Sequence, residues 1–152
     1  MDVQRTLRRH ISCVGIGLHS GNKVNLTLKP APADFGIRFR RTDLGDLEVP
    51  ATVHNLAGIQ LATGLARNEV SVETVEHLLA ALVSLGVDNV IVELNSPEVP
   101  IMDGSAAPFI YLIQEAGVKA LGVPRKYIKI VRPLRCRAAT SASRCIPPIT
   151  SR

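Results

Sequence analysis

Hydrophobic and polar side chains alternate along residues 23–29, KVNLTLK, and this two-residue period predicts a strand with one buried face. The segments 37–41, 47–53 and 87–95 show the same alternation. Pro50 lies within the segment 47–53, and because proline has no backbone N–H group we place this segment at a sheet edge or a bulge. The proline- and glycine-containing residues 30–36 and 96–108 predict turns and loops.

The period lengthens to that of a helix after residue 74. Apolar side chains then occupy positions i, i+3, i+4 and i+7 of one helical face: Val75, Leu78, Leu79 and Leu82. Thr74 is the predicted N-cap and Gly86 the predicted stop. A second helix is predicted from about Ala106 to Gly117. Several strands followed by helix, strand and helix indicate an α+β fold, a two-layer sandwich of a sheet and two helices.

The composition is that of one globular domain with an aliphatic core. The chain has 152 residues, of which 46% are hydrophobic and only 3% aromatic, with no tryptophan. No apolar run reaches the length of a membrane span, and the N-terminus has no apolar segment of the kind found in secretory signals. The three cysteines make no paired disulfide framework, so we expect a cytoplasmic protein.

The positive charge is concentrated at the C-terminal end. The formal net charge is +5, and residues 132–152 alone contain five arginines and no acidic residue. Residues 1–131 therefore carry equal numbers of basic and acidic side chains, which removes most of the support for nucleic-acid binding by the domain. Neither the strand period nor the helix period holds after about Pro133, and we expect this tail to be disordered.

Glu76 and His77 lie side by side at the start of the first predicted helix. None of the four histidines is followed four residues later by a second His or an Asp, so spacing alone gives no self-sufficient zinc site. On spacing alone His77 is better explained as a structural or surface histidine. Glu76 is explained in the same way as a first-turn carboxylate, whose interaction with the helix macrodipole stabilises by about 0.3–1 kcal/mol.

Two loops offer weaker candidates. The segment GIGLHSG, residues 15–21, matches neither the dinucleotide fingerprint nor the P-loop, and it predicts a turn before the strand at residue 23. Its functional alternative is a backbone that lines a ligand site, with His19 nearby. Asp103 and Ser105 precede the second helix, where capping explains both. A serine nucleophile would need a base and an orienting acid, and no nearby residue supplies them.

Several segments occur in the order found in one enzyme family: QRTL (4–7), GIGLHSG (15–21), LTLKPAP (26–32), GIRFRRTDL (36–44), TVEHLLAAL (74–82), GVDN (86–89) and VPIMDGSAAPF (99–109). Together they resemble the N-terminal half of UDP-3-O-acyl-N-acetylglucosamine deacetylase, the zinc amidase that commits bacteria with an outer membrane to lipid A synthesis. The resemblance covers about residues 3–131. It implies the first domain of a two-domain deacetylase fold, with a mainly antiparallel sheet and two helices.

The resemblance implies a catalytic role for the Glu–His pair. In this family the Glu of TVEH is the general base and the next His is a zinc ligand, which correspond to Glu76 and His77. Zinc lowers the pKa of bound water from 15.7 to about 7, and a nearby carboxylate takes the proton. The attacked group is the N-acetyl amide of the UDP-sugar, and the products are acetate and a free amine. Leu18, His19 and Gln60 are weaker candidates for lining the substrate site.

The chain also departs from the family pattern. The family's other two zinc ligands, a His and an Asp four residues apart, lie in a C-terminal domain, together with a further catalytic His and a Lys. A catalytic zinc site normally uses three protein ligands. We therefore expect this chain alone neither to hold catalytic zinc tightly nor to turn over substrate. Gly58 and Ile59 stand where the family usually has an Asp-Thr pair.

The sequence thus divides into an N-terminal deacetylase domain (1–126), the start of the second domain's first strand (127–131) and a tail outside the resemblance (132–152). The composition of the tail suggests a shifted reading frame or a wrongly assigned gene end. A rival interpretation is a non-catalytic fragment or interaction module whose basic tail binds anionic partners. Deleting residues 132–152 tests this rival interpretation. If all anion binding disappears while the domain stays folded, the tail acts only as a nonspecific polycation.

Overall fold

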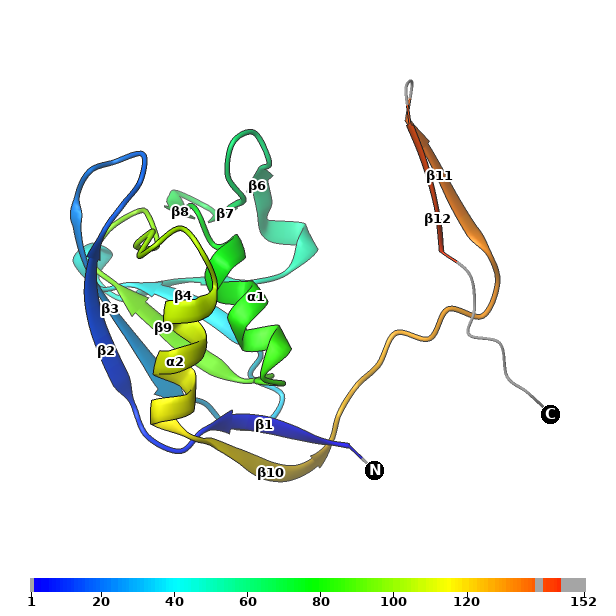
Figure 1. Cartoon of the computed structure of the whole chain (residues 1–152), viewed down its shortest axis with the longest axis horizontal. Helices are drawn as coiled ribbons and strands as arrows, with labels where there is room; N and C mark the ends of the chain where they lie inside the picture. Colours follow the sequence, from blue (N-terminus) through cyan, green and yellow to red (C-terminus); the bar gives the residue numbers. More distant parts are fainter. Residues whose placement is uncertain (1, 139–140, 146–152) are drawn as a thin grey trace.

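The computed structural model describes residues 2–138 and 141–145. At its centre is a five-stranded sheet in the order β2-β3-β9-β4-β5 (Figure 1). Strands β4 and β9 are parallel, and the other neighbouring pairs are antiparallel, as the mainly antiparallel expectation requires. The bounds are β2 (Ile11–Ile16), β3 (Lys23–Pro30), β4 (Ile37–Arg41), β5 (Leu47–Pro50) and β9 (Val90–Leu94). Pro50 ends the edge strand β5, which confirms its predicted edge position.

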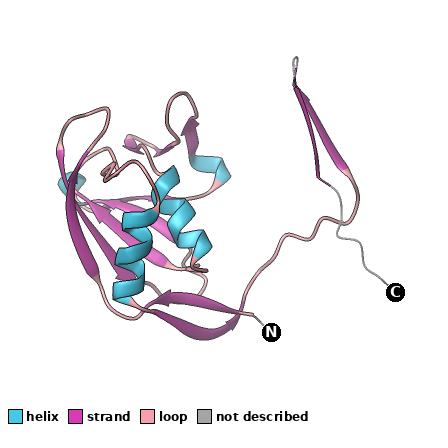
Figure 2. Cartoon of the chain, in the orientation of Figure 1, coloured by secondary structure: helices cyan, strands magenta, loops and turns pink. Residues whose placement is uncertain are grey.

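Helices α1 (Glu76–Ser84) and α2 (Ala107–Ala116) cover one face of this sheet (Figure 2). The side chains that alternation predicts to face inward are buried against them: Val24, Leu26, Leu28, Phe39, Val90, Val92 and Leu94. Each helix buries one apolar face in the same core: Leu78, Ala81 and Leu82 of α1, and Phe109, Ile113 and Ala116 of α2. The predicted α+β two-layer sandwich is therefore confirmed.

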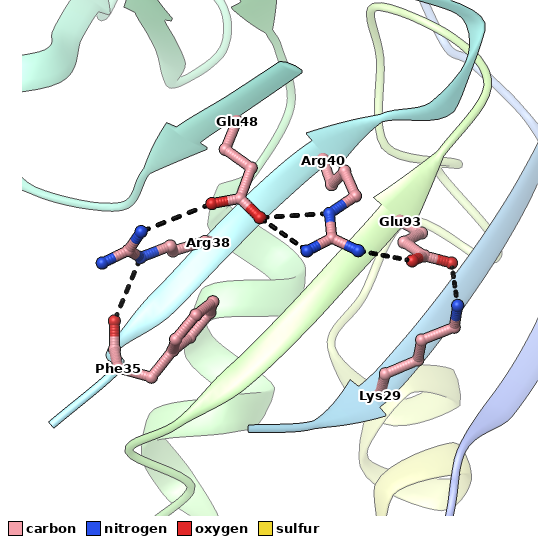
Figure 3. Close-up of polar contacts among 6 residues, drawn as sticks. All are labelled: Lys29, Phe35, Arg38, Arg40, Glu48 and Glu93. Carbon is pink, nitrogen blue, oxygen red and sulfur yellow. Dashed lines mark hydrogen bonds and ion pairs between the residues drawn. The ribbon is translucent and has the colours of Figure 1, made fainter. Parts of the chain in front are cut away.

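The opposite face of the sheet carries a row of ion pairs (Figure 3). Arg40 is the cross-strand neighbour of both Glu48 and Glu93, and its guanidinium lies 2.7 Å and 3.2 Å from their carboxylates. Arg38 extends the row from Glu48 at 3.3 Å, and Lys29 extends it from Glu93 at 2.6 Å. Opposite charges placed across neighbouring strands stabilise a sheet, so this polar face supports the register that buries the other face.

Two smaller sheets lie at the ends of the sandwich. Strands β6 (Leu56–Gly58), β7 (Gly64–Arg67) and β8 (Val70–Val72) form one of them, and β8 leads into α1. Strand β1 (Val3–Leu7) pairs with β10 (Val118–Pro124) in the other. Two 3₁₀ turns, η1 (Thr42–Leu44) and η2 (Val53–Asn55), flank β5, so the strand predicted for residues 47–53 ends early.

The C-terminal region differs from the sequence-based expectation. Residues 125–133 form no strand in this chain, and Tyr127, Ile128 and Val131 are exposed. The assignment of residues 127–131 to the first strand of a second domain stays a prediction. An alternating pattern forms a strand only where a neighbouring strand pairs with its backbone groups, and residues 125–133 have no such neighbour among the described residues. The tail expected to be disordered contains an antiparallel hairpin of β11 (Leu134–Ala138) and β12 (Ser141–Cys145). Residues 139–140 and 146–152 of that tail lie outside the described residues.

Candidate active site

The Glu–His pair occupies the first two positions of α1, and both side chains are half-buried. The prediction that Thr74 caps this helix is wrong, because Val75 is the N-cap and no side-chain hydrogen bond caps the helix. Thr74 instead has a φ of 58°, and its hydroxyl donates to Glu98 Oε1 over 3.0 Å. A buried bond to a carboxylate thus replaces the expected cap.

The carboxylate of Glu76 is oriented by the backbone just before β7. The N–H group of Thr63 donates to Glu76 Oε2 over 3.0 Å, and the carbonyl of Thr63 accepts from the N–H group of Val75 over 3.2 Å. These two bonds fix the segment before β7 against the first turn of α1. The carboxylate also lies at the positive end of the helix macrodipole, which favours a negative charge there.

A cavity of about 300 Å³ has Ala62, Gly64 and Glu73 in its lining, which are the neighbours of Thr63 and Thr74 along the chain. Residues of the β2–β3 loop, the β6–β7 region and β8 line it, among them His19, Gly58, Gln60, Leu61, Ser71 and Glu73. The structure therefore brings together His19 and Gln60, which the sequence proposed as site residues. Leu18, Glu76 and His77 are not part of the lining, and the Leu18 side chain is 59% exposed. The substrate-binding roles of Leu18, His19 and Gln60, the catalytic role of Glu76 and the metal-binding role of His77 remain predictions.

Glu98 connects the β2–β3 loop with Thr74 at the entrance to α1. The sequence did not single out this residue. The residue is only 2% exposed, and its carboxylate accepts from the N–H groups of His19 (3.0 and 3.2 Å) and Ser20 (2.9 Å) and from the hydroxyl of Thr74 (3.0 Å). Burial by itself raises the pKa of Glu98. Hydrogen bonds from His19, Ser20 and Thr74 outweigh burial and lower the pKa from 4.5 to about 2. The available sequence signal was a single acid in the otherwise uncharged stretch SPEVPIM.

Asp103 and Ser105 form a hydrogen-bonded turn just before α2, whose N-cap residue is Ala106 and has no side-chain cap bond. Asp103 Oδ1 accepts from the N–H group and the hydroxyl of Ser105 over 2.9 and 2.8 Å. The Ser105 oxygen in turn accepts from the N–H group of Ala107 over 3.1 Å. The two side chains satisfy backbone donors at a helix start, which is a structural task.

The residues that could hold a metal are few. Within residues 2–138 and 141–145, no three His, Cys, Asp or Glu side chains lie close enough together to hold a metal ion. A catalytic zinc site normally has three protein ligands, so the described residues by themselves do not fit one. The half-buried imidazole of His77 is the candidate for a single ligand.

Comparison with known proteins decides the family. The family model described as LpxC, UDP-3-O-acyl N-acetylglycosamine deacetylase, matches residues 4–151. The chain belongs to the LpxC deacetylase family. The resemblance inferred from the ordered segments is therefore confirmed, and the LpxC match extends beyond residue 131, where that resemblance ended.

Three LpxC relatives, each named UDP-3-O-acyl-N-acetylglucosamine deacetylase, illustrate the match. The protein of Stenotrophomonas maltophilia (strain R551-3) is 48% identical over 145 residues, which are 95% of this chain and 48% of the relative. The protein of Pseudomonas entomophila (strain L48) is 55% identical over 130 residues, 85% of this chain and 43% of the relative. The protein of Xanthomonas campestris pv. campestris (strain B100) is 49% identical over 148 residues, 97% of this chain and 49% of the relative.

The chain thus spans about half the length of the curated LpxC relatives that it matches. Among the described residues, neither helix is long and apolar enough to cross a membrane. The cytoplasmic location and the division of the chain at residues 126 and 131 remain predictions.

Proposed function

We propose that this chain supplies the general base and one zinc ligand of a deacetylase that removes the N-acetyl group of UDP-3-O-acyl-N-acetylglucosamine in lipid A biosynthesis. The names of the relatives support the reaction and the substrate. The observation that carries the residue assignment is the Glu76 carboxylate, held by a backbone N–H group directly beside His77 on the first turn of α1.

Amide hydrolysis needs a group that takes a proton from the attacking water and passes one to the leaving amine. Glu76 suits this task because Thr63 holds only its Oε2 atom. Among the described residues Oε1 accepts no hydrogen bond, so it stays available to a water or a substrate. His77 follows about 100° around the helix axis, so base and ligand point in different directions from one turn.

A bound zinc ion would supply an activated water. The described residues do not fit a three-ligand site, so we propose that the remaining ligands belong to the C-terminal domain of the full-length enzyme. The share of each relative that this chain covers supports this view. The chain alone should then show little or no deacetylase activity.

His19 and Gln60 are proposed to contact the substrate because both line the cavity described above. Leu18 precedes His19 in the same loop and exposes much of its side chain, so it is proposed as an apolar contact at the rim. Replacing any of these three should raise KM more than it lowers kcat, since none is proposed to take part in proton transfer.

A chimera tests the proposed function. Residues 1–131 replace the matching N-terminal part of the Stenotrophomonas maltophilia relative, and acetate release from UDP-3-O-acyl-N-acetylglucosamine is measured together with zinc content. We expect deacetylation by the chimera. Glu76→Gln should lower kcat by about 100-fold or more with zinc retained, and His77→Ala should lower zinc content.

His54→Ala is the matched control, because His54 is exposed and belongs to no proposed site. It should change neither zinc content nor kcat. A folded chimera that binds zinc but releases no acetate would contradict the proposal. An unchanged kcat in the Glu76→Gln chimera would contradict the role of the base.

A further inference from the structure

Thr74 has a backbone conformation that needs support from its surroundings. It is a β-branched residue with a φ of 58°, in the left-handed region that such residues rarely adopt, and it is 3% exposed. Residues held in such conformations gather at functional sites. Val75 and Glu76 follow directly, so the direction in which the chain leaves Thr74 sets the start of α1.

The group that holds Thr74 is the Glu98 carboxylate, and the same carboxylate holds the β2–β3 loop. Oε1 accepts from the Thr74 hydroxyl and from the His19 N–H group, each over 3.0 Å. Oε2 accepts from the N–H groups of His19 and Ser20 over 3.2 and 2.9 Å. Gly17 permits this close approach, since a Cβ there would lie 2.3 Å from Oε2.

Glu98 forms no ion pair among the described residues, so its buried charge is balanced by N–H and O–H donors. A buried charge is costly unless its hydrogen bonds are satisfied, and this arrangement therefore depends on all its donors staying in place. The donors come from two segments far apart in the sequence: residues 19–20 of the β2–β3 loop and residue 74 before α1.

Backbone bonds complete the connection to the proposed base. The N–H group of Glu73 donates to the carbonyl of Pro97 over 2.8 Å, which sets the segment of Glu98 beside the segment that enters α1. On the other side of Thr74, Val75 and Glu76 are both bonded to Thr63. A continuous series of contacts thus runs from the His19 loop through Glu98 and Thr74 to the Glu76 carboxylate.

We infer that Glu98 is the positioning residue of this site: its carboxylate fixes the loop that carries His19 and the backbone that aims Glu76 in one mutual arrangement. Its effect on turnover rests on the proposed function, whereas its effect on the arrangement does not. Glu98 acts through Thr74 and the loop amides, and nothing in its contacts brings it to the reacting atoms.

The first measurement is amide hydrogen exchange by NMR on the full chain at pH 7. In Glu98→Gln, the amides of His19, Ser20 and Thr63 should exchange at least tenfold faster relative to the core strands. Thr74→Val keeps the side-chain shape and removes only the hydroxyl, so it should release Thr63 while His19 and Ser20 stay protected.

Thr6→Val is the matched control. It removes another buried hydroxyl, one that donates to the Asn89 carbonyl over 2.7 Å and accepts from the Ala31 N–H group over 2.9 Å, away from the cavity. It should leave the exchange of His19, Ser20 and Thr63 unchanged relative to the core strands. If the three amides keep their relative protection in Glu98→Gln, the inference is overturned.

The second measurement is steady-state kinetics in the chimera described above. Glu98→Gln and Thr74→Val should each lower kcat at least tenfold, Thr74→Val with KM within threefold, while Thr6→Val stays within twofold of the parent. If the amides of His19, Ser20 and Thr63 exchange faster in Glu98→Gln but kcat is unchanged, Glu98 has only a structural role. That result would overturn its role as a positioning residue. An inactive parent chimera would count against the proposed function, and the exchange rates of Thr63 would still decide whether Glu98 aims Glu76.

Discussion

Replacing Glu98 by glutamine should destabilise the chain by about 3 kcal/mol at pH 7, and the loss should shrink as the pH falls. Glutamine keeps the size of the side chain, but it stays neutral at every pH. It also places an NH₂ group where the donors of His19, Ser20 and Thr74 require an acceptor.

The magnitude follows from the pKa of Glu98, which is about 2 in the folded chain against an ordinary value of 4.5. At about 1.36 kcal/mol per pKa unit, the difference corresponds to about 3 kcal/mol of stability. Because the folded-state pKa is the lower one, this stabilisation is complete above pH 4.5 and is lost as the pH falls towards 2. At pH 3 about half of it should remain.

Urea unfolding of the parent chain and of Glu98→Gln at pH 7, 4.5 and 3 measures this dependence. Other acids with lowered pKa values, such as Asp43 beside Arg41, are present in both proteins and cancel in the difference. Glu69→Gln, at an exposed position, should change stability by less than about 0.5 kcal/mol. A difference between parent and Glu98→Gln that is the same at pH 7 and pH 3 would refute the reasoning, as would a difference below about 1 kcal/mol at pH 7.

Two further predictions concern the two faces of the sheet. Glu93→Gln weakens the contacts of Glu93 with Arg40 and Lys29 (Figure 3) and should cost about 1–2 kcal/mol in urea unfolding. The cost should fall in 1 M salt, and a salt-independent value would argue against an electrostatic origin. Phe109→Ala empties a fully buried position between α2 and the sheet and should cost about 3–5 kcal/mol. Tyr111→Ala, on the exposed side of α2, should cost less than about 1 kcal/mol, and equal losses at both positions would contradict the assigned helix face.

The sequence predicted the elements that bury one face against the central core. The buried side chains recur every second residue in the strands β3, β4 and β9, and they lie on one face of each helix. These periods can be read from a short stretch of sequence. Strand β2 gave no such signal, because Val14 and Ile16 are exposed while Ile11 and Cys13 are half-buried. Strands β1 and β10 pair across more than a hundred residues, and no local pattern states which distant segment completes a sheet.

The sequence by itself determined the two-layer α+β class and, through the order of its segments, singled out Glu76 and His77 as the predicted base and zinc ligand. Only the tertiary structure showed that Thr63 orients the Glu76 carboxylate and that His19 and Gln60 share one cavity. It also revealed the buried hydrogen bonds of Glu98, whose donors His19 and Ser20 lie 79 and 78 residues away along the chain. The physical reason is that the charge of a buried carboxylate depends on the donors around it, and folding alone decides which distant backbone amides those are.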